Sequence, residues 1–367
     1  MSSSSGPGTF SPAEEEKGTH VLFLVDSFAQ IYRGYYAVRG LTGEDGFPSN
    51  AIFAMMKFLM KMHAEHPSEY GAFVFDEGKP PHRLQLAPLY KANRPPMPED
   101  LKVQLPLLED LIDAFGWKRL RWKNWEADDL IAVICGICPD RKIRIVSADK
   151  DLAQLVDSRV CMLVPDKDSS KGFSIRGESE VLEKFGVHPS EIVDYLAMIG
   201  DVSDNIPGLE GVGPKTAARL ISRFGSIKSI LLHAEEIPQE KLREKICSAS
   251  ERLRTNIELV KLVRTPPEGC DWNESSFRRE PADFPRILEI AERLRFRSLI
   301  RELTQMMASA TLPASDPESG PESDPESASR AARIGGTEEK GGTASSIPRA
   351  SVFRPGQEDP PEQLELF

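Results

Sequence analysis

The stretch VLFLVDSFAQIYR, residues 21–33, indicates the fold class of this chain. It begins as a continuous apolar run, reaches an aspartate at Asp26, and continues with the spacing of an amphipathic helix. An uninterrupted apolar strand is typical of a parallel sheet, because helices cover both faces of such a sheet. The stretch therefore predicts the first strand and helix of a parallel α/β sheet.

The same unit recurs further along the chain. Further apolar runs lie at residues 71–76 (GAFVFD), 143–149 (IRIVSAD) and 161–164 (CMLV), and helical patterns cover residues 50–63 and 101–114 and begin again at Glu126. We predict a central, mostly parallel sheet flanked by helices.

Composition divides the rest of the chain. From about residue 178 the pattern becomes helical, with amphipathic stretches at residues 179–185, 189–199, 214–223 and 240–263. We expect an α/β domain over residues 20–177 and a helical domain over residues 178–308. Residues 1–19 and 309–367 are rich in Ser, Gly, Pro and acidic residues, so we expect a disordered leader and a disordered acidic tail.

The net charge of −11 argues, taken alone, against a nucleic-acid partner, since such proteins usually have a basic surplus. However, the tail from residue 309 has 11 acidic and 5 basic residues, and the first 19 residues have 3 acidic and 1 basic, which leaves −3 for residues 20–308. Without the nine candidate metal ligands described below, that segment has a net charge of +6. The objection to nucleic acid therefore loses its force.

Composition also excludes some protein classes and suggests a compartment. The chain is 40% hydrophobic and has no apolar run near the roughly 20 residues that span a bilayer, so we expect neither a membrane protein nor a fully disordered one. Five scattered cysteines and an N-terminus without a signal-peptide pattern indicate a reducing cytoplasm. Cys135 and Cys138 form a C-x-x-C pair, but no second pair completes a zinc site, and we interpret both as core residues.

Acidic side chains follow several of the predicted strands. Asp26, Asp76 and Asp149 end strands, which places them at the edge of the sheet where α/β proteins bind ligands. WEADDL and GDVSDN add more carboxylates; read singly, the first is a helix N-terminus and the second a polar loop with Asx turns. The full candidate set is Asp26, Asp76, Glu126, Asp128, Asp129, Asp149, Asp151, Asp201 and Asp204.

So many carboxylates cannot stay ionised close together without cations. Carboxylate oxygens without nearby His or Cys favour Mg²⁺ or Mn²⁺ over Zn²⁺, and nine acids are enough for two ions. Two such ions would stabilise the attacking and leaving oxygens in phosphodiester hydrolysis. The sequence thus predicts a two-metal hydrolase site.

Residues 79–102, KPPHRLQLAPLYKANRPPMPEDLK, bring cations next to Asp76. We expect Lys79 and Arg83 to contact a polyanion and Tyr90 to stack on a base. Lys91 and Arg94 are candidates to hold the scissile phosphate. The alternative is a solvated, mobile loop. Tyr32 and Arg33, on the helix after Asp26, are further candidates, against the alternative of an ordinary amphipathic helix.

A second phosphate-binding pattern lies at residues 208–221, GLEGVGPKTAARLI. A turn with Gly211 and Gly213 leads into a helix with Lys215 and Thr216 in its first turn, so backbone N–H groups face an anion. This helix-hairpin-helix pattern, at about residues 206–223, grips a duplex backbone without reading its sequence. A plain helix–helix turn is the alternative. Carbonyl groups near Gly211 and Gly213 are also candidates to bind K⁺.

Together these motifs resemble the 5′-nucleases, namely the 5′-3′ exonuclease domain of bacterial DNA polymerase I and the related flap endonucleases. LVDSFAQIYR, FVFD, YKANRPPMPEDL, WEADDL, SADKDLAQLV, GDVSDNIPG and GVGPKTA occur in the family's order between Val21 and Thr265. The resemblance implies a PIN-like α/β fold and a two-metal active site beneath a flexible arch at about residues 77–102. It places eight of the nine acids on the family's metal carboxylates, Asp129 beside them, and Lys91 and Arg94 on the arch's basic positions.

The chain departs from the family pattern in places. Ser27 stands where a Gly commonly follows the first Asp, and Tyr36 stands where a His is usual, so the entry path of the substrate is expected to differ. No polymerase domain follows, which suggests a free-standing nuclease. The last residues, Gln363, Leu364, Glu365, Leu366 and Phe367, resemble the peptide with which bacterial replication proteins bind the sliding clamp; a chance apolar end is the alternative.

The sequence as a whole predicts a Mg²⁺-dependent, structure-selective 5′-nuclease of the bacterial nucleoid. Its expected substrates are DNA with a 5′ flap, nick or 5′ end, including RNA primers on DNA, and we expect a monomer that does not bind membranes. A catalytically idle DNA-junction binding module is one alternative, although none of the eight matched carboxylates is missing. A metal-dependent ribonuclease acting on free RNA is another, disfavoured by the helix-hairpin-helix pattern.

Overall fold

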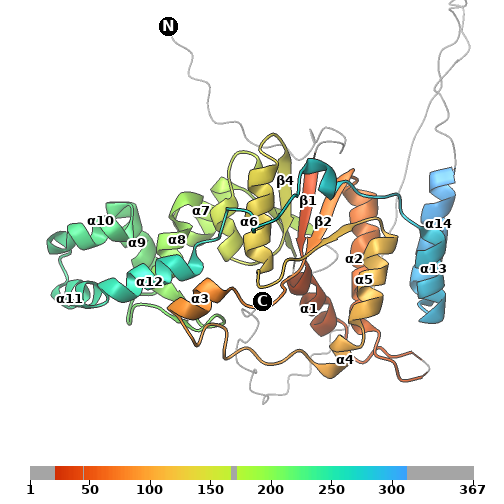
Figure 1. Ribbon diagram of the computed structural model, residues 1–367, viewed down its shortest axis with the longest axis horizontal. Helices are drawn as coiled ribbons and strands as arrows, with labels where there is room; N and C mark the ends of the chain where they lie inside the picture. Colours follow the sequence, from red (N-terminus) through yellow and green to blue (C-terminus); the bar gives the residue numbers. More distant parts are fainter. Residues whose placement is uncertain (1–20, 44, 167–171, 312–367) are drawn as a thin grey trace, which may run out of the picture.

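A six-stranded sheet in the order β3-β2-β1-β4-β5-β6 forms the centre of the protein (Figure 1). The computed structural model describes residues 21–43, 45–166 and 172–311. The first five strands are parallel and β6 is antiparallel to β5. The strands are β1 (Val21–Asp26), β2 (Tyr70–Val74), β3 (Lys118–Leu120), β4 (Lys142–Val146), β5 (Val160–Pro165) and β6 (Phe173–Arg176). The expected α/β class is confirmed.

Helices cover both faces of the sheet, which explains the continuous apolar strands. In β1, Leu22 and Leu24 belong to one buried cluster, whereas Phe23 and Val25 belong to a second cluster on the opposite face. The first face packs against α6 (Ala127–Ile137). The second packs against α1 (Ser27–Ala37), α2 (Asn50–Glu65) and α5 (Leu105–Ala114).

Beyond β6 the chain is helical, as predicted. Helices α8 to α12 extend to one side of the sheet in Figure 1. The elements are α7 (Glu178–Phe185), η4 (Pro189–Glu191), α8 (Ile192–Ile199), β7 (Gly200–Asp201), β8 (Ile206–Pro207), α9 (Pro214–Phe224), α10 (Ile227–Leu232), η5 (Ala234–Glu236), α11 (Glu240–Ser248) and α12 (Ser250–Val260). The amphipathic stretch at residues 240–263 forms two helices, α11 and α12.

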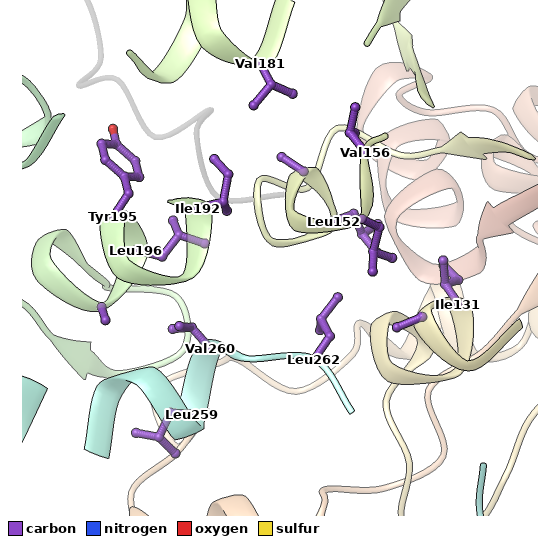
Figure 2. Packing of buried hydrophobic residues seen from close by; sticks show 14 of the residues in the cluster. Ile131, Leu152, Val156, Val181, Ile192, Tyr195, Leu196, Leu259, Val260 and Leu262 are labelled. Atoms are coloured by element: carbon purple, nitrogen blue, oxygen red, sulfur yellow. The ribbon is translucent and has the colours of Figure 1, made fainter. Parts of the chain in front are cut away.

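The helical part is joined to the sheet through a shared apolar core. Figure 2 shows Leu262, just past the end of α12, lying between Leu196 of α8 and the residues Ile131 of α6 and Leu152 of the 3-10 helix η2 (Asp151–Leu155), with Val260 beside Leu196. These side chains form one continuous buried cluster. The helical part is therefore packed against the elements that follow the strand ends.

The last two helices return to the α/β part. After the short 3-10 helix η6 (Glu274–Phe277), α13 (Phe284–Arg293) and α14 (Arg297–Thr311) pack on the same side of the sheet as α2 and α5. Ile287, Ile290 and Leu299 share a buried cluster with Leu108 and Phe115. Residues 284–303 thus add to the core of the α/β part, although we expected everything from residue 178 to 308 to lie in the helical domain.

Two further expectations concern smaller segments. The segment 77–102 contains two short helices, α3 (Pro81–Leu86) and α4 (Glu99–Lys102), before α5 begins at Leu105. Cys135 and Cys138 are buried free thiols in the apolar cluster around α6, which confirms their interpretation as core residues. Among the described helices, none is long and apolar enough to cross a membrane.

Candidate metal centre

The carboxyl ends of β1 and β4 lie side by side and bring two of the predicted acids together. Asp26 is the last residue of β1 and caps α1 by accepting a hydrogen bond from the Ala29 N–H at 3.2 Å. Asp149 follows β4 by three residues. Strand order reverses between β1 and β4, because the chain builds outward from β1 first to one side and then to the other. Such a switch point is where open α/β sheets hold their ligands.

Asp128, in the first turn of α6, completes a cluster with Asp26 and Asp149. One carboxylate oxygen from each lies within 4.8 Å of the other two. Asp76, two residues past β2, borders the cluster and accepts a hydrogen bond from the Ala127 N–H at 3.2 Å. Three carboxylates at this spacing are a donor set suited to a hard divalent cation.

The electrostatics of the cluster support this fit. Burial, and then the charges of Asp76 and Asp149, raise the pKa of Asp26 to about 7. Burial and the neighbouring Asp149 and Asp26 raise the pKa of Asp128 well above its usual range. Burial likewise raises the pKa values of Asp76 and Asp149. Divalent cations would remove this repulsion and leave all four carboxylates ionised.

Asp151, Asp201 and Asp204 extend the acidic site toward the helical part. Asp151 begins η2, and its N–H donates to the Asp149 carboxylate at 2.9 Å. Burial and the neighbouring Asp149, Asp204 and Asp201 raise the pKa of Asp151 well above its usual range. The ribbon of β7 and β8 carries Asp201 and Asp204.

The carboxylate of Asp201 is stabilised in its ionised form. It accepts hydrogen bonds from the Ser203 N–H at 2.7 Å and hydroxyl at 2.6 Å, and Lys150 Nζ lies 3.0 Å away. Burial opposes ionisation, but these partners outweigh it and lower the pKa of Asp201. Asp201 therefore differs from Asp26, Asp128 and Asp149, because its partners lower its pKa whereas the pKa values of those three are raised.

Lys91 and Arg94 lie against the acids, as their sequence position suggested. Lys91 Nζ is 2.6 Å from Glu126 Oε1 and 3.6 Å from Asp204 Oδ2. Arg94 pairs with Asp204 Oδ1 at 2.6 Å, and its side chain is 49% exposed. Burial opposes ionisation of Glu126, yet Lys91 and Arg83 lower its pKa. The half-exposed Arg94 is thus available at the rim of the site.

Three predicted site residues have different surroundings from those expected. Tyr90 is 3% exposed, and its hydroxyl bonds the carboxylates of Glu126 at 3.1 Å and Asp204 at 3.2 Å, so it has no free ring face for a base. Arg83 is 2% exposed and pairs with Glu126 and Asp129, so it cannot reach a polyanion. Asp129 is 1% exposed, and Arg83 and the Val263 N–H occupy its carboxylate, so it is not free to bind a metal.

The remaining basic and aromatic candidates are spread around this site. Lys79 Nζ donates to the carbonyl groups of Tyr90 and Lys91, which fixes the turn that carries Lys91. Burial is the largest effect that raises the pKa of Tyr32, and Asp76 and Arg94 are among the charges that act on it. Arg33 donates instead to the Asp166 carbonyl, next to the end of β5.

The loop of the predicted helix-hairpin-helix pattern leads into α9. Gly213 precedes α9 as its N-cap, Lys215 is exposed and Thr216 is half-buried in the first turn. Lys245 of α11 adds a cation that the sequence did not suggest, because its Nζ donates to the Glu210 carbonyl at 3.2 Å. The loop thus has an exposed face with two lysines.

Comparison with known proteins agrees with the fold. Residues 21–186 match the family model of the 5′-3′ exonuclease N-terminal resolvase-like domain, and residues 187–283 match that of the 5′-3′ exonuclease C-terminal SAM fold. A 5′-3′ exonuclease of Aquifex aeolicus is 32% identical over 292 residues, which cover 79% of this chain and 97% of that protein. The chain belongs to the 5′-3′ exonuclease family.

Other relatives are longer or more distant. The thermostable DNA polymerase I of Thermus thermophilus is 37% identical over 303 residues, but the match spans 35% of its length. The structure of T5 5′-exonuclease with bound divalent metal ions (zinc) matches with a TM-score of 0.53 at 18% identity, covering 79% of this chain and 98% of that one. The catalytic core of Rad2 in complex with DNA substrate matches with a TM-score of 0.56 at 15% identity, covering 78% and 93%. Both share the fold.

Several polar residues of this exonuclease-family site were not singled out in the sequence. Ser147 donates to Asp26 at 3.0 Å and accepts from the Asp149 N–H at 3.1 Å, which ties the ends of β1 and β4 together. Lys150 and Ser203 hold Asp201. All three lie inside the motifs SADKDL and GDVSDN: Lys150 and Ser203 stand between two acids of their motifs, and Ser147 stands two residues before Asp149.

The predicted clamp-binding residues Gln363, Leu364, Leu366 and Phe367 lie outside the described residues, as does the leader.

Proposed function

We propose that this chain is a metal-dependent 5′-3′ exonuclease and flap endonuclease that hydrolyses DNA phosphodiester bonds, in the removal of RNA primers and in DNA repair. The observation that carries the proposal is the convergence of Asp26, Asp128 and Asp149 within 4.8 Å at the switch point of the sheet. Family membership and the exposed helix-hairpin-helix loop support the same reaction and substrate class.

Two Mg²⁺ or Mn²⁺ ions fit the carboxylates. Asp26, Asp128 and Asp149 would hold one of them, and Asp76, Asp151, Asp201 and Asp204 line the remaining space. When bound, the ions supply Lewis acidity and an activated water. We expect Lys91 and Arg94 to hold the scissile phosphate. Their ion pairs with Glu126 and Asp204 would position the two side chains. Tyr32 borders the same space.

The substrate would be a DNA end or flap. The loop around Gly211 and Gly213, with Lys215 and Thr216, would hold the duplex through its phosphates, which positions the DNA without selecting a sequence. We expect a monomer that works on 5′ flaps, nicks and 5′ ends in the bacterial nucleoid. A K⁺ ion at the carbonyl groups of this loop is also part of the proposal. Lys245 already donates to one of these carbonyl groups, that of Glu210. Comparing the affinity for DNA in K⁺ and in Na⁺ tests whether K⁺ binds there.

Cleavage of end-labelled substrates tests the reaction directly. A 5′ flap, a nicked duplex and a hairpin RNA are incubated with and without Mg²⁺. We expect Mg²⁺-dependent cutting of the flap and the nicked duplex, and loss of flap cutting in the double variant Asp149→Ala, Asp151→Ala. If the wild type cuts no DNA, or if the double variant still cuts, the proposal is wrong.

The C-terminal sequence supports a separate proposal about recruitment. Residues 363–367 (QLELF) would bind the bacterial sliding clamp through apolar anchors on a long polar tether, which raises the effective concentration of the nuclease near DNA. The measurement is clamp binding by the full chain and by a chain lacking these residues. Undiminished clamp binding after the deletion would contradict this proposal.

A further inference from the structure

A buried arginine outside the metal cluster joins three parts of the protein. Arg83, on α3, uses all three guanidinium nitrogens. One terminal nitrogen bonds the carboxylates of Glu126 and Asp129, the latter at 2.6 Å, and the other bonds Asp129 Oδ1 at 2.9 Å. Its Nε donates to the Leu259 carbonyl at 2.9 Å, and the second terminal nitrogen also donates to the Lys261 carbonyl at 3.2 Å.

The partners of Arg83 belong to two different parts of the protein, the metal cluster and the helical part. Glu126 is the residue immediately before α6, two residues before Asp128 of the metal cluster, and it also pairs with Lys91. Leu259 and Lys261 are at the end of α12, where the chain leaves the helical part. The last carbonyl groups of a helix lack partners within the helix, and a cation there is favoured by the helix dipole. Arg83 therefore binds the end of α12 to the start of α6.

A second side chain makes a parallel connection. Gln154 of η2 donates to the Val260 carbonyl at 3.0 Å and accepts from the Leu262 N–H at 3.1 Å. Because η2 begins at Asp151, this contact ties the end of α12 to the other side of the acidic site. Figure 2 shows the apolar packing of Leu259, Val260 and Leu262 in the same junction.

We infer that Arg83 is a positioning residue that sets the place of cleavage, because it fixes the helical part, which holds the duplex, relative to the metal cluster, which cuts it. The inference rests on the proposed function. Lysine cannot replace the planar fork of an arginine, which here satisfies two carboxylates and two carbonyl groups at once. A looser junction lets the duplex shift along the cluster, so neighbouring phosphodiester bonds come within reach.

The test maps cut positions at single-nucleotide resolution on one 5′-labelled flap. For Arg83→Lys we expect the single main cut of the wild type to spread over neighbouring bonds, with kcat about tenfold to a hundredfold lower. Affinity for the duplex should stay within about twofold, since the phosphate contacts are intact. Arg141→Lys is the matched control, because Arg141 is also buried in an ion pair, with Glu274, but at the opposite end of β4. It should keep the wild-type cut.

A second variant protects the test against misfolding. Gln154→Ala removes the parallel connection, and we expect the same spread of cuts to a smaller extent. Thermal melting followed by circular dichroism shows which variants are folded. The wild-type cut position in folded Arg83→Lys, or in Gln154→Ala if Arg83→Lys does not fold, would overturn the inference. Absence of cutting by the wild type would instead contradict the proposed function.

Discussion

At the scale of single residues, the acidic cluster opposes the stability of the fold. Asp26, Asp128 and Asp149 are held close together by β1, α6 and β4, and burial together with mutual repulsion raises their pKa values. When folding raises the pKa of a carboxyl group, that group contributes fully to the stability of the fold at pH values below its unfolded pKa. This contribution is lost as the pH rises through its folded pKa. For Asp26 this loss runs from about pH 4 to about pH 7.

Asp128→Asn should therefore separate stability from activity. The amide of the variant side chain cannot ionise, so it adds no charge repulsion to the cluster at high pH. In EDTA we therefore expect the variant to be more stable than the wild type by about 1–3 kcal/mol at pH 8 and by much less at pH 5. With Mg²⁺, we expect flap cleavage to fall at least about a thousandfold. Urea unfolding at both pH values checks the first expectation. Asp140→Asn, an exposed acid before β4, is the control; equal stability of Asp128→Asn and wild type at pH 8 would contradict the argument.

The residues that the sequence placed correctly differ physically from those it did not. Acids at strand ends can be located from the strand pattern, because the ends of parallel strands meet at one edge of the sheet. Arg83 and Tyr90 stood in a basic, Pro-rich segment that is typical of an exposed loop. Their burial depends on partners far along the chain. Leu259, for example, is 176 positions beyond Arg83, and a local sequence pattern cannot reveal a contact at that separation. The pairing of Asp129 with the Arg83 guanidinium could not be predicted for the same reason, since the two residues are far apart in the sequence.

At the scale of elements, the ribbon of β7 and β8 depends on two glycines. Gly200 has a φ of 76°, and a Cβ there would lie 2.3 Å from the Gly208 nitrogen and 2.5 Å from the Ile206 carbonyl oxygen. The close approach of these strands presents Asp201 and Asp204 to the site. The motif GDVSDNIPG therefore supplies two carboxylates and also the glycines that allow the two strands to approach each other closely.

Gly200→Ala tests this requirement. We expect a loss of about 2–4 kcal/mol in the free energy of unfolding, because the contacts are with backbone atoms that cannot move aside. Gly136→Ala is the matched control, since its Cβ would meet nothing within 4 Å on α6; it should leave stability unchanged or raise it by up to about 1 kcal/mol. Chemical denaturation measures both, and a Gly200→Ala variant as stable as Gly136→Ala would show that the ribbon adapts.

The elements that the sequence did not predict have weak local signals. β3 is three residues long, KRL, and β6 (FSIR) pairs with β5 alone, at the edge of the sheet. Short strands at an edge need few apolar residues, so no continuous run marks them. The central strands β1, β2 and β4 have mostly apolar buried residues, although β4 includes the buried Arg144, and these strands were predicted.

At the scale of the whole molecule, the chain returns to its first domain. α13 and α14 lie beyond the segment that matches the exonuclease family models, yet they pack on α2 and α5. Leu299→Ala should therefore cost about 2–5 kcal/mol, because the side chain is 0% exposed within that cluster. Leu232→Ala, 78% exposed on α10, should change stability by less than about 0.5 kcal/mol. Thermal unfolding compares them; a Leu299→Ala variant as stable as Leu232→Ala would mean that α14 contributes little to the core.

The distribution of charge over the molecule predicts how DNA binding depends on salt. The acids gather at the strand ends, whereas the exposed Lys215 stands in the first turn of α9, next to the helix-hairpin-helix loop. In EDTA, which prevents cutting, we expect Lys215→Ala to weaken binding of a nicked duplex equally for all sequences and to reduce the slope of log affinity against log salt by about 1. Lys142→Ala, an exposed lysine that begins β4 at the opposite edge of the sheet, should leave the slope unchanged. Fluorescence anisotropy over a salt series measures both slopes. Equal slopes for Lys215→Ala and the wild type would mean that the loop does not touch phosphate, so the duplex would have to be held by the rim around Arg94 instead.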